Sequence, residues 1–220
     1  EIYENQKRRN KREAPDRMKK SRTSSMRGFL PFMKKQGLYR LADDTGYAYL
    51  TTPVMYHPEE VNYYLKRDFF REYSANGSLF FFQKTVPLKD CDNLIIYGHH
   101  MNSGKMFAAL EGYRERKFFK EHPFIFFNTL QGEEKYQVFA VFSTPVYTGS
   151  DFAYYTFTKR KTESHMKQFI EAVKERSFYD TGITADYGEK LLTLSTCEYS
   201  QENGRLVVVA KKIAEKEITK

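Results

Sequence analysis

The sequence predicts a mainly β fold with a few helices, closed into a barrel rather than layered as an α/β fold. The first observation is that apolar runs are short and turn signals follow one another at close intervals, which favours a barrel. The second is that helical spacing of apolar residues is confined to a few segments. The third is size, because 220 residues with 40% hydrophobic content suffice for one domain with its own core, plus a tail.

Eight segments have the short apolar or alternating pattern of a strand. In chain order they are 47–51, 54–56, 79–83, 93–97, 124–128, 136–142, 191–197 and 205–210. Turn residues separate several of them. Asn76-Gly77-Ser78 precedes the third strand, 131–134 predicts a hairpin between the fifth and sixth, and Asn203-Gly204 ends the turn between the last two.

Helices are expected at 29–35, 59–70 and 104–113, and around Met166 to Val173. In the last of these, apolar residues recur at i, i+3, i+4 and i+7, which is the spacing of one helix face. The Met and aromatic stripe within 104–113 indicates a core-facing helix rather than a cofactor site.

The net charge of +8 belongs to the N-terminal tail. Residues 1–40 hold 13 Lys/Arg against 4 Asp/Glu, a net +9, and the remainder holds 23 against 24, a net −1. We expect 1–36 to be a basic N-terminal extension or helix and 37–220 to be the folded domain. The charge run 1–28 fits a solvated helix or linker, or attraction to anionic lipids or wall polymers. Aromatic residues do not alternate with the basic ones, so the pattern of a nucleic-acid site is missing.

The strand at 191–197 carries the first candidate for chemistry. Leu192 and Leu194 fall on one face, whereas Thr193, Ser195 and Cys197 fall on the other. A hairpin through Asn203-Gly204 would bring Arg205 back beside Cys197. A guanidinium next to a thiol favours the thiolate and can hold a developing oxyanion. A Cys at a strand end is also commonly a small buried hydrophobe.

Two histidines follow another predicted strand, in Tyr97-Gly98-His99-His100-Met101. Cys, His and Arg together make a plausible acyl-transfer set. The second thiol, Cys91, stands between Asp90 and Asp92, whose charges disfavour its thiolate. Two cysteines make no disulfide framework, although one bridge between them is conceivable. The other three histidines share no ligand-like spacing, and we expect no metal or organic cofactor.

These residues resemble the class B sortases, cysteine transpeptidases of Gram-positive cell surfaces. The resemblance rests on the segments 97–101, 193–197 and 205–211, together with 177–182, and runs from about Tyr47 to Ile213. It implies a closed barrel of about eight strands with an N-terminal extension. The chain departs from the class in having His100 where Asn is common, no Asp in the 79–82 run, and no Trp. The missing Asp and Trp concern the substrate groove.

The resemblance implies transpeptidation of secreted proteins that bear a C-terminal sorting signal of the Asn-Pro-x-Thr type. Cys197 would be the nucleophile, His99 the general acid, and Arg205 the group that stabilises the oxyanion and the thioacyl intermediate. The implied substrate-binding residues are Leu65, Tyr97, Ser195, Thr196 and Glu198, with the segment 151–158 lining the groove. The acceptor would be an amine of a peptidoglycan precursor or of a pilin.

A location at the outer face of the cell membrane is also implied. The sequence holds no run of 18 apolar residues, and it begins with Glu rather than Met. We therefore expect the class's membrane anchor to lie upstream of this chain.

Two alternatives remain open at this stage. A papain-like peptidase also uses Cys and His, but it places Cys first and at the start of a helix, whereas here His99 precedes Cys197 and Cys ends a strand. A catalytically silent wall-binding module would tolerate loss of Cys197.

Overall fold

The computed structural model describes residues 39–43, 52–82, 88–101, 106–128, 132–146, 152–198 and 203–214, with backbone alone for 39–43, Thr52 and Glu198. The chain divides into two units, Glu1–Gly37 and Leu38–Lys220, and every described residue belongs to the second. The basic segment 1–28, the predicted helix at 29–35 and the predicted strand at 47–51 lie outside the described residues. Within the described part, no helix has the length and apolar character needed to cross a membrane.

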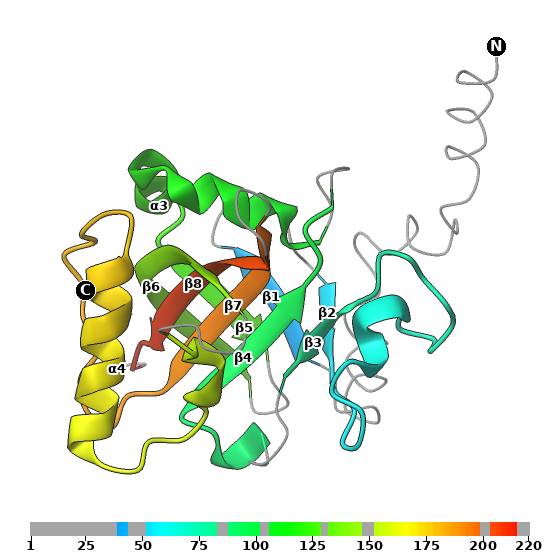
Figure 1. The fold of residues 1–220 in the computed structure, drawn as a ribbon, viewed down its shortest axis with the longest axis horizontal. Coiled ribbons are helices and arrows are strands. Elements are labelled where there is room, and N and C mark those ends of the chain that lie inside the picture. The colour runs from blue at the N-terminus through cyan, green and yellow to red at the C-terminus, as the bar shows by residue number, and fades with distance from the viewer. Residues whose placement is uncertain are drawn as a thin grey trace. The chain divides into compact units, whose positions relative to one another are not determined.

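The described part of the chain forms a closed barrel of eight strands, which confirms the predicted fold class (Figure 1). The strands are β1 (Tyr39–Asp43), β2 (Thr52–Met55), β3 (Leu79–Phe81), β4 (Asn93–Gly98), β5 (Phe124–Asn128), β6 (Glu133–Pro145), β7 (Leu191–Glu198) and β8 (Gly204–Lys212). Their order around the barrel is β1-β2-β3-β4-β7-β8-β6-β5, and β1 pairs with β5 to close it. The β2–β3 and β4–β7 pairs are parallel, and the other neighbours are antiparallel.

Strands β7 and β8 are buried on both faces. Leu192, Leu194 and Val208 belong to the cluster that fills the barrel. The alternate residues, such as Leu191 and Val209, belong to a second cluster outside the barrel, packed with α4 (Glu163–Arg176). Burial on both faces explains why the charged residues of these two strands, Glu198, Arg205, Lys211 and Lys212, lie only at or near the strand ends. The small polar face of β7 is therefore also covered, which alternation alone did not indicate.

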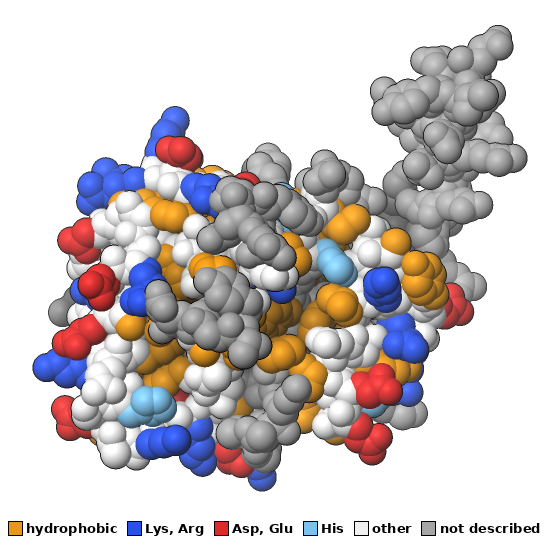
Figure 2. All heavy atoms as spheres, viewed as in Figure 1, with side chains coloured by type: hydrophobic (Ala, Val, Ile, Leu, Met, Phe, Trp, Pro, Cys, Tyr) orange, Lys and Arg blue, Asp and Glu red, His pale blue; other side chains and the backbone are white. Residues whose placement is uncertain are grey.

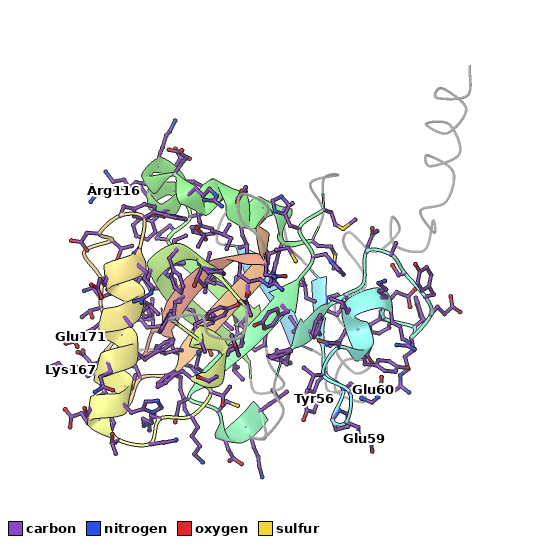
Figure 3. The ribbon with its side chains drawn as sticks, in the orientation of Figure 1. Tyr56, Glu59, Glu60, Arg116, Lys167 and Glu171 are labelled. Carbon is purple, nitrogen blue, oxygen red and sulfur yellow. The ribbon has the colours of Figure 1, made fainter. Side chains whose placement is uncertain are left out.

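Helix α4 confirms the amphipathic spacing around Met166. Its first turn is capped by Thr162, whose Oγ1 accepts a hydrogen bond of 3.1 Å from the main-chain N–H of His165. The apolar stripe is buried against the barrel, whereas Lys167 and Glu171 point away from it (Figure 3).

The helix predicted over 59–70 is wrong. Only a single 3₁₀ turn, η2 (Tyr63–Lys66), forms there. The side chain of Asp68 accepts hydrogen bonds from the main-chain N–H groups of Phe70 and Glu72, at 2.9 and 3.0 Å, so it draws these donors into a turn. Arg71 then takes a positive φ of 68°, which a helix does not allow. Figure 3 shows Tyr56, Glu59 and Glu60 beside this turn.

The remaining short helices are η3 (Leu88–Asp90), η4 (Phe107–Arg114), α3 (Arg116–Glu121) and η5 (Tyr154–Thr156). The element predicted at 104–113 is therefore present from Phe107 as a 3₁₀ helix, with Phe107, Leu110 and Tyr113 buried as expected. Its neighbour α3 was not predicted.

Candidate active site

Parallel pairing of β4 and β7 brings the histidines to the candidate thiol. The register joins Asn93 to Leu191 at one end and Gly98 to Thr196 at the other. One residue further along, His99 follows the end of β4, and Cys197 is the next residue of β7, so both lie at the same end of these neighbouring strands. The sequence places them 98 positions apart, and only this register brings them together.

The β7–β8 hairpin supplies the third predicted residue. Cys197 lies directly opposite Arg205 in the antiparallel register, so the two side chains share one face of the sheet. Asn203 adopts a φ of 54°, as the predicted turn requires. Arg205 Nη1 donates hydrogen bonds of 2.8 Å to the carbonyl of Gly204 and 3.3 Å to that of Asn203. The guanidinium is thus held against the carbonyls of its own turn while remaining on the face of the thiol.

Both histidines contact main-chain carbonyls. His99 Nε2 lies 2.7 Å from the carbonyl oxygen of Leu65 in η2. His100 Nδ1 lies 3.2 Å from the carbonyl oxygen of Cys197 itself. His100 also forms an antiparallel bridge with Met106, so its own backbone is fixed. His100 therefore supports the end of β7, whereas His99 is the histidine tied to the segment around η2.

Three hydroxyl groups contact one another close to this end of β4 and β7. Tyr154 Oη lies 2.7 Å from Ser195 Oγ and 3.2 Å from Tyr97 Oη. Tyr154 and Ser195 are 1% and 0% exposed, so water cannot replace these bonds. Burial is the main cause that raises the pKa of both phenols, well above the ordinary value for Tyr97, and both therefore remain neutral. We call Tyr97, Tyr154 and Ser195 the hydroxyl cluster.

The predicted substrate residues differ in what they expose. Leu65 is 36% exposed and Tyr97 is half-buried, so both can present surface to a ligand. The hydroxyl of Thr196 is buried and donates to the carbonyl of Gly98 at 2.8 Å. Ser195 is bonded within the hydroxyl cluster. Glu198 ends β7, and its side chain lies outside the described residues.

The second thiol is remote from this site. Cys91 is 4% exposed and precedes β4, whereas Cys197 follows the last residue of β7 that pairs with β4. The β4–β7 ladder between them is about 20 Å long at ~3.3 Å per residue, far beyond the reach of a disulfide. The two cysteines are accordingly not joined to each other. Tight burial makes Cys91 a packing residue, while Cys197 is partly accessible.

A charged cluster holds the opposite end of the same two strands. The buried carboxylate of Asp92 contacts Arg160 Nη1 at 2.7 Å and Lys190 Nζ at 2.8 Å. Burial raises the pKa of Asp92, but the hydrogen bonds and charges of Lys190 and Arg160 outweigh it and leave the pKa below its ordinary value. In the described part of the chain, no group of three or more His, Cys, Asp or Glu side chains is placed to hold a metal ion.

Sequence reasoning missed two parts of the site. The first is the carbonyl of Leu65, because a main-chain contact has no signature in the side-chain pattern. The second is Tyr154, which lies in the segment expected to line the groove but is buried.

The segment around Leu65 exposes apolar side chains. They are Tyr56, Leu65, Phe70 and Tyr73. On the face drawn in Figure 2, hydrophobic side chains gather toward the centre and charged ones toward the periphery.

Comparison with known proteins places this geometry in a family. A sortase domain model matches residues 59–213. Sortase B of Staphylococcus aureus is 34% identical over 153 residues, which cover 67% of this chain and 59% of that protein. The chain therefore spans less than two thirds of the length of that relative.

Two solved structures are similar over most of the chain. A Staphylococcus aureus sortase B–substrate complex superposes with a TM-score of 0.72 at 30% identity, covering 86% of this chain and 84% of that one. A crystal structure of sortase B complexed with triglycine has a TM-score of 0.73 at 30% identity, covering 90% and 91%.

Proposed function

Because the chain belongs to the sortase family, we propose that it is a cysteine transpeptidase of the class B type, with Cys197 as nucleophile. The observation that carries this proposal is the pair of registers at one end of the barrel. The β4–β7 ladder brings His99 to the end of β7, and the β7–β8 ladder sets Arg205 opposite Cys197. The residues proposed as nucleophile, proton donor and guanidinium therefore lie at the same end of three neighbouring strands, with His99 directly after β4.

The proposed reaction has two acyl-transfer steps. The Cys197 thiolate attacks the carbonyl carbon of the scissile peptide, forming a C–S bond, and the C–N bond breaks as His99 protonates the leaving amine. An acceptor amine then attacks the thioester, gives its proton to His99 and releases the thiolate. Arg205 would leave its turn carbonyls to face the oxyanion that develops in each step.

For the donor we propose a secreted protein with a C-terminal sorting signal of the Asn-Pro-x-Thr type. Leu65 and Tyr97 would contact the signal directly, and Glu198 and the 151–158 segment would complete the groove. Ser195 and Thr196 would act mainly by holding the groove in shape, because both hydroxyls are buried and bonded internally. For the acceptor we propose an amine of a peptidoglycan precursor or of a pilin. The sortase B complex with triglycine makes that peptide the natural probe.

We also propose that the chain acts at the outer face of the cell membrane of a Gram-positive bacterium, held there by an anchor upstream of these residues. The basic extension 1–36 would then lie between this anchor and the catalytic domain 37–220. The proposed reaction requires no metal or organic cofactor.

Peptide turnover tests the proposed function. The protein is incubated with a panel of sorting-signal peptides, with and without triglycine, and the products are identified by mass spectrometry. We expect cleavage after Thr in an Asn-Pro-x-Thr peptide and a new amide with triglycine. Cys197→Ala and His99→Ala should abolish both products, whereas the matched variants Cys91→Ala and His165→Ala should retain them. Hydrolysis with no triglycine adduct would favour a peptidase, and no cleavage of any peptide would reject the proposal.

A further inference from the structure

The contact between His99 and Leu65 fixes which ring nitrogen carries a proton. A carbonyl oxygen can only accept a hydrogen bond, so the Nε2 that lies 2.7 Å from it must be protonated. The other nitrogen, Nδ1, is then the one left to take up and release a proton. In a histidine that works as an acid and base, the partner of one nitrogen commonly selects the tautomer and the ring orientation.

The Leu65 carbonyl is itself held in place from two sides. Within η2, the main-chain N–H of Leu65 donates to the carbonyl of Asn62 at 3.0 Å. From the segment that leads into β3, the N–H of Ser78 donates to the carbonyl of Tyr64 at 3.0 Å, and Ser78 Oγ donates to the carbonyl of Arg67 at 2.9 Å. The η2 turn is thus bonded to the entrance of β3 on both sides of Leu65.

Gly77 lies directly against this carbonyl. A Cβ at Gly77 would be 2.3 Å from the Leu65 oxygen and 2.8 Å from the Tyr64 oxygen, which are main-chain atoms with little freedom to move. Only a residue without a side chain allows the two segments to approach this closely. Gly77 also has a φ of 57°, which suits glycine.

We propose that the main-chain carbonyl of Leu65, supported by Gly77, is the positioning group for His99 and that it assigns proton transfer to Nδ1. This inference rests on the proposed role of His99 as the general acid. It gives the site a fourth member, which comes from the backbone rather than from a carboxylate or amide side chain. Leu65 then has two separate roles, because its carbonyl orients the histidine and its side chain can contact substrate.

The test displaces the carbonyl and measures both the tautomer and turnover. Gly77→Ala requires the Leu65 oxygen to move by about 1 Å, and a misplacement of this size can cost ~10²-fold in rate. The matched control is Gly182→Ala. It imposes a similar backbone penalty at a φ of 75°, but its Cβ would meet nothing within 4 Å. We expect kcat to fall ten-fold or more in Gly77→Ala and to stay within two-fold in Gly182→Ala.

Long-range ¹H–¹⁵N spectra of His99 supply a readout that a merely structural role would not move. The wild type and Gly182→Ala should show one tautomer, with Nε2 protonated, and Gly77→Ala should show averaged ring nitrogens. If Gly77→Ala does not fold, an ester in place of the Leu65–Lys66 peptide bond weakens the same acceptor without adding an atom. The ester should lower kcat while leaving the peptide KM unchanged.

One outcome would overturn the positioning role alone. In it, the wild type turns over peptide, and Gly77→Ala or the ester protein keeps the same His99 tautomer and the same kcat. Absence of turnover in the wild type would overturn the proposed function instead. The tautomer measurement needs no substrate, so the two failures are distinguishable.

Discussion

Removing one hydroxyl from the hydroxyl cluster should destabilise the barrel measurably. In Tyr154→Phe the ring remains, but Ser195 Oγ and Tyr97 Oη lose the oxygen that joins them at 2.7 and 3.2 Å. Ser195 is fully buried, so its hydroxyl cannot turn to water, and Tyr97 is left as its partner. Leaving such a group entirely unpaired costs about 1–3 kcal/mol. We expect a loss of ~1–2 kcal/mol in unfolding free energy, because Tyr97 is only half-buried and can find water.

A double-mutant cycle in urea separates this interaction from general disruption. Tyr154→Phe, Ser195→Ala and the double variant are compared by the midpoint and slope of unfolding. The double variant should be more stable than the sum of the single losses predicts, by about 1 kcal/mol, since neither hydroxyl then lacks its partner.

The matched control for this cycle is Tyr155→Phe. The hydroxyl of this neighbouring tyrosine has no hydrogen bond among the described residues, and its loss should cost less than ~0.5 kcal/mol. Equal losses in Tyr154→Phe and Tyr155→Phe, or strict additivity in the cycle, would refute the cluster as a unit of stability.

Three further predictions concern charge. Asp92→Asn should lower the unfolding free energy by about 1–3 kcal/mol at pH 7, because Arg160 and Lys190 lose their carboxylate but can still reach water. Because the pKa of Asp92 is depressed in the folded state, this stability is present above pH ~4 and is lost as pH falls through the folded pKa. Asp92→Asn should therefore flatten the acid side of a plot of stability against pH. An unchanged acid side would exclude Asp92 as the cause of that pH dependence. Arg205→Lys should lower peptide turnover ~10²-fold with little change in stability, because Lys keeps the charge but loses the planar fork of donors, and near-normal turnover in Arg205→Ala would remove it from the mechanism. Deleting 1–28 should leave turnover of soluble peptides within about two-fold, and a ten-fold loss would show that this segment reaches the site.

The barrel was predictable where the sequence pattern and the final environment agree. The strands at 93–97, 191–197 and 205–210 are apolar because they are buried, and their bounds match β4, β7 and β8 closely. Strand β1 was not predicted, because Tyr39–Asp43 mixes charged and apolar residues and its pairing with β2 and β5 decides its conformation. The false helix at 59–70 shows the converse, since the apolar spacing was helical but the Asp68 side chain captured the backbone donors.

The candidate site divides in the same way. Cys197, His99 and Arg205 could be chosen from the sequence because their side-chain chemistry and the family resemblance point to them. The contacts that bring them to one end of the barrel could not be predicted, because they consist of a strand register and hydrogen bonds to main-chain carbonyls. Tyr154 carries no signal at all in the sequence, since one buried tyrosine among 17 looks like any other core aromatic.

The central claim is that acyl transfer passes through Cys197. The protein is mixed with an Asn-Pro-x-Thr peptide without acceptor amine, quenched in acid, digested and mapped by mass spectrometry. We expect the mass of the peptide's N-terminal fragment, minus water, as a thioester on the segment that holds Cys197, and its discharge when triglycine is added before the quench. An adduct on Cys91, or turnover that persists in Cys197→Ala, would contradict it.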